Sequence, residues 1–167
     1  MHYFAYGSNM SVPRLCHRVP SALTLDVAVL YGHRLVFQKA GRDGSAKCDI
    51  AVTAHQADAV HGVLYTLDPK HKAFLDEAEG LGMGYEVKNV AVQRGDGSTL
   101  VAFTYFATRI DPQLQPYSWY LHHVIRGAKE HKLPGHYIAS IASIGTVNDP
   151  DRDRHQMELA IYGRAAG

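Results

Sequence analysis

Short runs of β-branched and aromatic residues, several with alternating polar positions, fill the first two-thirds of the chain. Such runs predict strands over residues 1–5, 23–29, 34–39, 49–54, 60–67, 85–93 and 99–108. The last two strands are expected to form a hairpin around Arg94-Gly95-Asp96-Gly97. Residues 40–47 contain two glycines, so we expect a loop there.

Helical spacing is clearest after Asp68-Pro69, an N-cap followed by proline at the first helical position. This helix should run to Glu79 and stop at Gly80. Ser11 is expected to cap an earlier short helix over residues 12–18. Three more helices are predicted over residues 115–131, 136–144 and 150–162, the last capped by Asp149.

These elements together predict an α+β fold with a mainly antiparallel sheet or small barrel and helices beside it. The 167 residues fit a single domain spanning residues 1–167, because no repeat, low-complexity tract or linker interrupts them.

Charge excludes some partners. Lys and Arg number 17 and Asp and Glu number 16, so we expect neither nucleic acid nor a membrane as a partner. The basic run Arg14-Leu15-Cys16-His17-Arg18 is attributed to a solvated helix face.

The cysteines and the apolar runs bear on the location of the protein. Two cysteines make no disulfide framework, and the apolar runs are too short to span a membrane, so a cytoplasmic protein is expected.

The turn Tyr6-Gly7-Ser8-Asn9 follows the first strand and is a candidate anion site. Glycine permits close approach of a ligand, and successive backbone N–H groups before a helix can hold a carboxylate or an oxyanion. An ordinary strand-to-helix turn could contain the same residues, so both interpretations stay open.

Glu79 is a second candidate because it lies at the C-terminal end of a predicted helix, where the helix dipole disfavours negative charge. A carboxylate kept at such a position is a candidate general base. Asp76 lies one turn earlier on the same side and could join it.

Other chemistry is less well supported. The 11 histidines include the adjacent pair His122-His123, which cannot easily face one metal, and there is no Cys-x2-Cys, so we expect no metal site. Ser8 lacks the second glycine of a nucleophile elbow and a clear His and Asp, and Cys16 and His17 point apart on a helix. A Ser- or Cys-dependent hydrolase is therefore a minor alternative.

Three segments together resemble the γ-glutamylcyclotransferase superfamily. They are Tyr3-Phe4-Ala5-Tyr6-Gly7-Ser8-Asn9, then Leu75-Asp76-Glu77-Ala78-Glu79-Gly80, and then Gly127-Ala128-Lys129-Glu130 followed by Leu133-Pro134. Their order and spacing match the family from Tyr3 to about Ala142. The resemblance implies a small mixed, mainly antiparallel β-barrel with flanking helices.

The resemblance also implies an activity and its residues. A γ-glutamyl amide would cyclise to 5-oxoproline and release an amine, without a metal or organic cofactor. Glu79 would be the general acid and base. The substrate would contact Tyr3, Phe4, Ala5, Tyr6, Gly7, Ser8, Asn9 and Tyr120, the last placed by its spacing from Gly127. The loops at residues 80–84 and 94–97 are expected to border the pocket.

Three questions stay open. A small-molecule-binding module of the same fold with altered catalysis is the alternative to the enzyme. The sequence does not identify the leaving amine, which could be an amino acid, a lysine side-chain amine or an acyl-chain amine. It also does not decide between a monomer and a homodimer.

Overall fold

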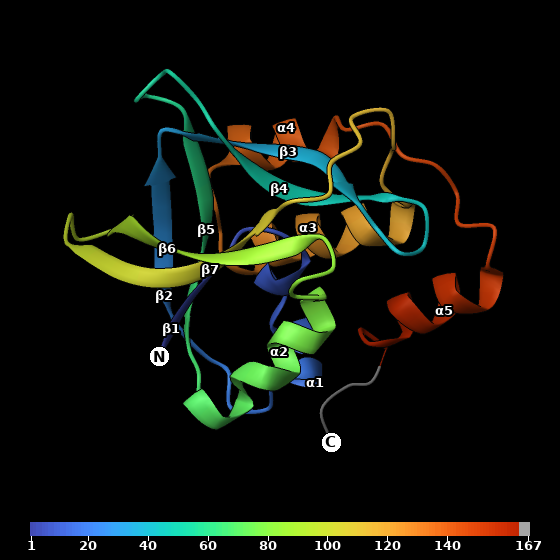
Figure 1. The fold of residues 1–167 in the computed structure, drawn as a ribbon, viewed down its shortest axis with the longest axis horizontal. Helices are drawn as coiled ribbons and strands as arrows, with labels where there is room; N and C mark the ends of the chain where they lie inside the picture. Colours follow the sequence, from blue (N-terminus) through green and yellow to red (C-terminus); the bar gives the residue numbers. More distant parts are fainter. Residues whose placement is uncertain (164–167) are drawn as a thin grey trace.

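The computed structural model describes residues 1–163, so the last four residues of the predicted 1–167 domain lie outside the described residues. Five strands close a barrel in the order β1-β5-β2-β6-β7 (Figure 1). β1 pairs parallel with β7, and the neighbouring pairs are antiparallel. The predicted fold class, a mixed and mainly antiparallel barrel with flanking helices, is confirmed. The barrel strands are β1 (His2–Ala5), β2 (Leu23–Tyr31), β5 (Ala59–Thr66), β6 (Tyr85–Arg94) and β7 (Thr99–Ala107).

A second, two-stranded sheet forms from β3 (His33–Ala40) and β4 (Ala46–Val52). The predicted loop over residues 40–47 is therefore too long, because only residues 41–45 connect these strands. Asp43 tightens the turn by accepting a hydrogen bond from the Ser45 N–H at 3.1 Å. Gly44 allows the reversal, because its φ of 80° lies in the left-handed region that favours glycine.

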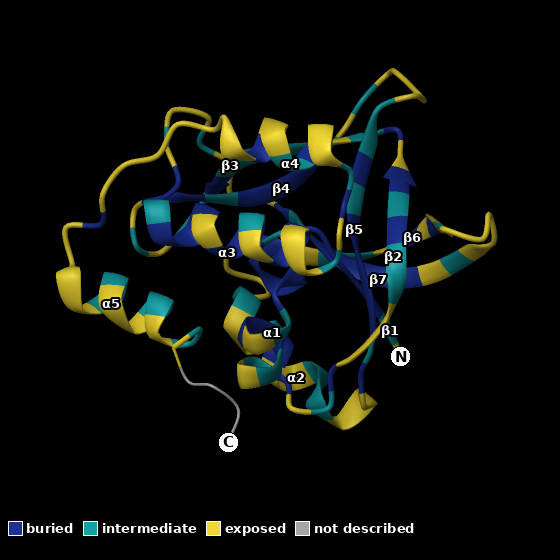
Figure 2. Cartoon of the chain, turned by 180° about the vertical axis from the view of Figure 1, so that it is seen from behind, coloured by how far each residue is buried: buried dark blue, intermediate teal, exposed yellow. Residues whose placement is uncertain are grey.

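Helices surround the barrel on one side and at its ends: α1 (Val12–Arg18), α2 (Lys72–Glu79), α3 (Ser118–Glu130), α4 (Gly135–Ala142) and α5 (Arg152–Ala160). Short 3-10 helices precede two of them, η1 (Ser8–Met10) and η2 (Pro69–His71). Figure 2 shows α3 and α4 with buried sides turned toward the sheets and exposed sides toward solvent. Among the helices in residues 1–163, none is long and apolar enough to cross a membrane.

Local capping signals place α2 as predicted. The Asp68 side chain accepts from the Lys70 N–H at 2.9 Å, and Pro69 opens the turn that leads into α2. Gly80 ends the helix in the left-handed conformation, with φ of 72°. The helix therefore presents Glu79 as its last residue.

Two other predicted helix starts are wrong. α3 begins at Ser118 rather than at residue 115, because Pro116 has no N–H to donate and Tyr117 is the extended N-cap. Asp149 does not cap α5, since Asp151 accepts from the Arg154 N–H at 2.9 Å. Asp149 instead accepts a hydrogen bond from the Trp119 indole at 2.7 Å.

Gly127 lets α3 lie directly against η1. A Cβ atom at this position would lie 2.5 Å from the Met10 carbonyl carbon and 2.5 Å from the Ser11 nitrogen. Any larger side chain would push the helix away from the turn. The close approach fixes the segment after β1 relative to α3, and both elements contribute to the site described next.

Candidate functional site

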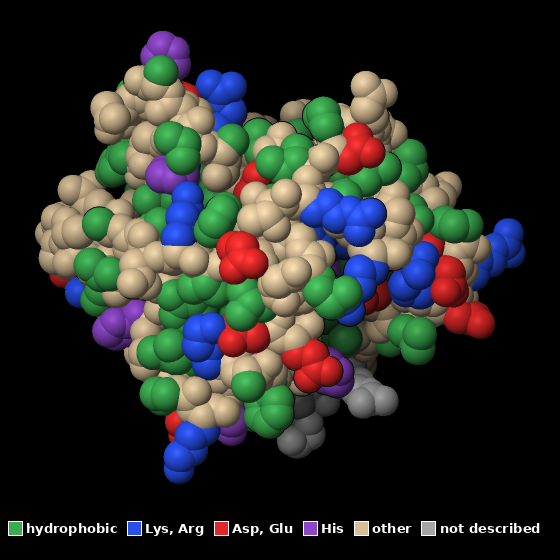
Figure 3. Space-filling view, viewed as in Figure 1, with side chains coloured by type: hydrophobic (Ala, Val, Ile, Leu, Met, Phe, Trp, Pro, Cys, Tyr) green, Lys and Arg blue, Asp and Glu red, His purple; other side chains and the backbone are tan. Residues whose placement is uncertain are grey.

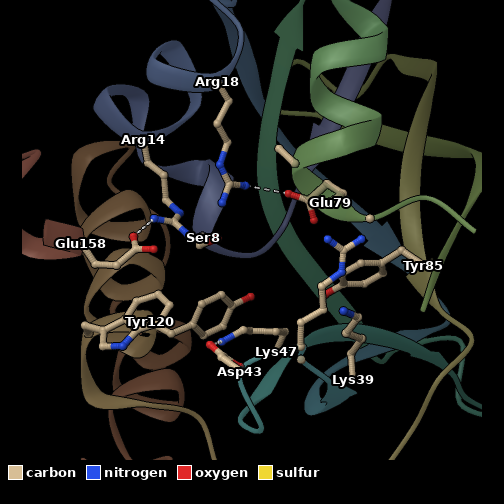
Figure 4. Close-up of a pocket in the computed structure, with 15 residues that line it drawn as sticks. Ser8, Arg14, Arg18, Lys39, Asp43, Lys47, Glu79, Tyr85, Tyr120 and Glu158 are labelled. Carbon is tan, nitrogen blue, oxygen red and sulfur yellow. Dashed lines mark hydrogen bonds and ion pairs between the residues drawn. The ribbon is translucent and has the colours of Figure 1, made fainter. Parts of the chain in front are cut away.

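An inner pocket and an outer cleft meet where α1, α2, α3 and the β3–β4 turn come together at one end of the barrel (Figure 4). The inner pocket, about 20 Å³, is lined by Tyr3, Tyr6, Gly7, Ser8, Asn9, Cys48, Glu79, Tyr85, Tyr105 and Tyr120. The outer cleft, about 220 Å³, has charged walls formed by Arg14, Arg18, Lys39, Arg42, Asp43, Lys47, Glu79 and Glu158. Ser8, Glu79, Tyr85 and Tyr120 border both spaces. On the face in Figure 3, Lys and Arg side chains gather around a hollow near α5.

Glu79 lies at the junction of the two spaces, with its carboxylate held by two donors. Its Oε1 accepts from the Asn9 side-chain amide and from the Arg18 guanidinium, each at 2.8 Å. The hydrogen bonds to this carboxylate within residues 1–163 both end on Oε1. The other oxygen, Oε2, is therefore available to a ligand, and Figure 4 shows the ion pair with Arg18.

Asn9 is the centre of this network. Besides Glu79, its amide nitrogen contacts the Tyr3 hydroxyl at 3.1 Å, and its side-chain oxygen accepts from Arg18 at 2.8 Å. Asn9 is 3% exposed, so these contacts are shielded from water. Three elements, β1, η1 and α1, thus orient the residue at the end of α2.

The turn at Gly7 brings the backbone into the inner pocket. The first hydrogen bond of the following 3-10 helix runs from the Met10 N–H to the Gly7 carbonyl at 3.0 Å. The N–H groups of Ser8 and Asn9 therefore have no acceptor within that helix. A Cβ atom on Gly7 would lie 3.0 Å from Cys48 Cβ and 3.4 Å from the Tyr120 hydroxyl, so glycine is needed for this approach.

Tyr120 forms the opposite wall. Its hydroxyl oxygen accepts a hydrogen bond from the Cys48 backbone N–H at 3.0 Å, and Tyr85 donates to the Cys48 carbonyl. Burial raises the pKa of both phenols, so they are neutral hydroxyl groups. The structure thus brings Glu79, Tyr3, Tyr6, Gly7, Ser8, Asn9 and Tyr120 to the inner pocket.

Phe4 and Ala5 are the two predicted site residues that the structure does not bring to the pocket. Both side chains are fully buried in the barrel. Phe4 packs where Gly62 leaves room, since a Cβ there would lie 2.7 Å from the Phe4 ring. Consecutive side chains of a strand point to opposite faces, so both faces of β1 are covered at this point.

The basic run at residues 14–18 is not a solvated helix face. Arg14 is 7% exposed and forms an ion pair with Glu158 of α5. Arg18 pairs with Glu79 instead of solvent. α1 has only seven residues, which is too short for its apolar pattern to indicate that both guanidinium groups turn inward.

Asp76 also departs from the prediction, because it does not join Glu79. Its Oδ1 accepts from the Tyr105 hydroxyl at 2.6 Å and from the Lys72 ammonium at 2.5 Å. Although Asp76 lies only one helical turn from Glu79, its hydrogen bond to Tyr105 of β7 holds it away from that residue.

The two loops expected to border the pocket differ. The loop at residues 80–84 contributes Gly80 to the outer cleft, whereas Arg94 of the 94–97 turn pairs with Asp26.

A buried histidine supports Arg14. His123 is 0% exposed, with Nε2 3.0 Å from the Arg14 guanidinium and Nδ1 2.6 Å from the Tyr162 hydroxyl. Nε2 also lies 3.1 Å from Glu158 Oε2, so this nitrogen is placed between the Arg14 donor and a carboxylate acceptor. The Tyr162 hydroxyl in turn donates a hydrogen bond to Ser11 Oγ at 3.1 Å. Burial lowers the pKa of His123 to about 4, which agrees with a neutral ring.

Several residues of the site carried no sequence signal, namely Arg18, Lys39, Arg42, Lys47, Tyr85 and Tyr105. They come from elements distant in the chain, so a local pattern cannot group them. In the part of the chain that the structure describes, no three His, Cys, Asp or Glu side chains group as metal ligands.

The nucleophile candidates have poor surroundings. Burial raises the pKa of the Cys48 thiol to about 12 and that of the Cys16 thiol as well, so neither forms a ready thiolate. Cys16 Sγ contacts the Ala22 carbonyl at 3.7 Å rather than a base. No His, Asp or Glu side chain hydrogen bonds to the Ser8 hydroxyl within residues 1–163.

Comparison with known proteins defines the class to which this fold and site belong. Residues 59–141 match the model of the AIG2-like family. The chain is 32% identical over 146 residues to the human γ-glutamylcyclotransferase, covering 85% of this chain and 77% of that protein. The chain belongs to the γ-glutamylcyclotransferase family.

Solved structures agree. A γ-glutamyl cyclotransferase superposes with a TM-score of 0.88 at 27% identity, covering 98% of this chain and 99% of the other. The crystal structure of an uncharacterized human protein gives a TM-score of 0.79 at 29% identity, covering 93% of this chain and 97% of that one. The family relationship supports an enzyme that acts on a small molecule.

Proposed function

We propose that this protein converts a γ-glutamyl amide to 5-oxoproline and a free amine, with Glu79 as general acid and base. The observation that carries the proposal is the geometry of Glu79: Oε1 is held by Asn9 and Arg18, each at 2.8 Å, and Oε2 is left for the substrate. A held carboxylate with one free oxygen is the arrangement that a proton shuttle requires.

The reaction begins when Glu79 takes a proton from the substrate's α-ammonium group. The freed amine attacks the γ-carbonyl carbon of the same molecule, the C–N bond of the lactam forms, and the carbonyl oxygen becomes an oxyanion. The bond to the leaving nitrogen then breaks. Two protons pass from the α-nitrogen to the departing amine, and Glu79 carries them.

The turn after β1 supplies the oxyanion site. The N–H groups of Ser8 and Asn9 lack acceptors within their own helix, so they can donate to the developing charge in a pocket shielded from water. Preorganised donors of this kind contribute about 10²- to 10³-fold to kcat. Tyr3, Tyr6 and Tyr120 line the small space behind this oxyanion site.

Ring closure suits such a site because the nucleophile and electrophile belong to one molecule. Intramolecular reactions with aligned groups reach effective molarities of about 10⁵ M or more. The protein then needs a base, an oxyanion site and a folded substrate, all of which the chain's own residues supply. Both cysteines are free, and we propose a cytoplasmic location.

The test is product release. Purified protein is incubated with γ-glutamyl amino acids and γ-glutamyl alkylamides, and 5-oxoproline is measured by chromatography. Time-dependent 5-oxoproline above the spontaneous rate supports the proposal. Binding of γ-glutamyl compounds without 5-oxoproline would favour the alternative, a binding module of the same fold, and release of glutamate in its place would favour a hydrolase.

A further inference from the structure

The outer cleft carries more positive than negative charge. Five cationic residues line it, Arg14, Arg18, Lys39, Arg42 and Lys47, against the three acids Asp43, Glu79 and Glu158. Three of the cations are paired: Arg14 with Glu158, Arg18 with Glu79, and Lys47 with Asp43. Lys39 and Arg42 have no acidic partner within residues 1–163, which leaves two uncompensated charges beside Glu79.

Lys39 is unusual because it is largely buried and has no acidic partner among the described residues, while its ammonium still reaches the cleft. The residue is 5% exposed, and its ammonium lies 4.7 Å from the centre of the Tyr85 ring. A cation–π contact does not replace the hydrogen bonds of an ammonium group, and partial removal of an unpaired charge from water is unfavourable. Burial accordingly lowers the pKa of Lys39, against the attraction of Glu79. An anionic ligand in the cleft would supply the missing partner.

Arg42 lies at the rim of the same cleft. Its guanidinium is 2.9 Å from the Met83 sulfur, a weak acceptor, and a Cβ on Gly80 would lie 3.2 Å from it. Gly80 directly follows Glu79 in the chain, so the Arg42 guanidinium lies beside the end of α2. The planar donor fork of arginine matches a carboxylate in a two-point contact.

The location of these two cations bears on the leaving group. Under the proposed function, the γ-carbonyl group of the substrate lies between Glu79 and the backbone N–H groups of the Ser8 turn, at the mouth of the inner pocket. The leaving amine must then extend into the outer cleft, where Figure 4 shows Lys39 next to Tyr85 and across the cavity from Arg14. Lys39 and Arg42 line this outer cleft, within reach of the leaving group.

We propose that the leaving amine is an acidic amino acid, linked through its α-nitrogen, whose two carboxylates bind Lys39 and Arg42. This inference rests on the proposed function and selects among the open leaving groups. If the leaving group were a lysine side-chain amine with another cationic group nearby, Lys39 and Arg42 would repel that cationic group. An alkylamine would leave both residues without an anionic partner. The glutamyl derivative of an acidic amino acid fills the charge deficit.

The first test compares substrates that differ by one charge. We expect kcat/KM for γ-glutamyl-glutamate to exceed that for the isosteric γ-glutamyl-glutamine by about tenfold or more, since a charged hydrogen bond is lost. γ-Glutamyl-glutamine should in turn exceed γ-glutamyl-propylamide. Equal values for glutamate and glutamine derivatives would overturn the inference while leaving 5-oxoproline formation, and thus the proposed function, intact.

The second test uses variants. Lys39→Met and Arg42→Gln should each lower kcat/KM for γ-glutamyl-glutamate by about 10- to 100-fold, and should change turnover of γ-glutamyl-propylamide by less than about threefold. Lys88→Met makes the same change on β6, outside the cleft, and should alter neither substrate. An equal loss on both substrates in Lys39→Met and Arg42→Gln would overturn the assignment. A Lys39→Met protein that fails to fold leaves Arg42→Gln and the substrate series to decide.

Discussion

Asn9 and Glu79, which are 70 residues apart in the chain, meet through a 2.8 Å hydrogen bond from the Asn9 amide to Glu79 Oε1. This contact joins the turn after β1 to the last residue of α2. The turn at residues 6–9 and the Glu79 carboxylate, which the sequence suggested separately, therefore border the same pocket. The proposed reaction depends on this arrangement.

Removing the Asn9 amide should loosen Glu79. In Asn9→Ala the carboxylate keeps Arg18 but loses its second donor, and Tyr3 loses its contact with the turn. We expect kcat to fall by about 10- to 100-fold, because a small displacement of a catalytic group has effects of that order. Steady-state kinetics with 5-oxoproline detection measures this. Asn89→Ala on the exposed side of β6 is the control, and an Asn9→Ala enzyme as active as the control would contradict the positioning role.

Ser8 should be dispensable as a side chain. The proposal uses its backbone N–H, and Ser8→Ala keeps that group. We expect kcat within about tenfold of the wild type, whereas loss of a true nucleophile lowers kcat by about 10⁶-fold. A near-complete loss of turnover in folded Ser8→Ala would support the hydrolase alternative, and covalent labelling of Ser8 by a serine-directed reagent would support it further.

Tyr120→Phe should cost stability as well as activity. The Cys48 N–H donates to the Tyr120 hydroxyl at 3.0 Å, and phenylalanine would leave this buried donor without an acceptor. The expected loss is about 1–3 kcal/mol of unfolding free energy. Urea denaturation measures it, with Tyr31→Phe on the exposed end of β2 as the matched control. Equal urea midpoints for the two variants would show that the Tyr120 hydroxyl does not contribute to stability.

Acid should destabilise the fold through His123. Its pKa falls from 6.5 to about 4 on folding, mainly through burial. Between these pH values the unfolded chain binds a proton that the folded protein does not, so the free energy of unfolding decreases as the pH is lowered from 6.5 to 4. The loss at the lower end is about 3 kcal/mol.

Thermal or urea unfolding across that range tests this. His123→Gln removes the titrating group and should flatten this part of the pH dependence, although its stability at neutral pH is lower. His17→Gln, a change at an exposed histidine, should keep the wild-type slope. An unchanged slope in His123→Gln would mean that other groups cause the acid sensitivity.

Local signals predicted the parts of the fold that local interactions determine. α2 is the clearest case, because Asp68, Pro69 and Gly80 set its ends without help from other elements. The strands followed for the same reason, from their β-branched and aromatic runs. The β3–β4 turn was shorter than predicted, since Asp43 and Gly44 close it in five residues.

The candidate site was only partly predictable. Glu79 and the Tyr6–Asn9 turn each had a local peculiarity, but Arg18 and Glu79 are 61 residues apart and pair only because α1 packs near α2. Lys39 looked like an ordinary strand residue. Its burial without an acid depends on the packing of β3 against Tyr85 and Gly84, which are distant in the chain, so no short stretch of sequence encodes it. Phe4 and Ala5 were included with their neighbours, although the strand places them in the core.

The most direct test of the account is 5-oxoproline release by Glu79→Gln beside Glu77→Gln, the latter an exposed acid on the same helix. Both proteins are first shown to be folded by circular dichroism, and binding of a γ-glutamyl compound is measured by calorimetry. The account predicts that Glu79→Gln binds but releases 5-oxoproline at least about 10²-fold more slowly than wild type, while Glu77→Gln retains its activity. Wild-type turnover by a folded Glu79→Gln protein would contradict the account.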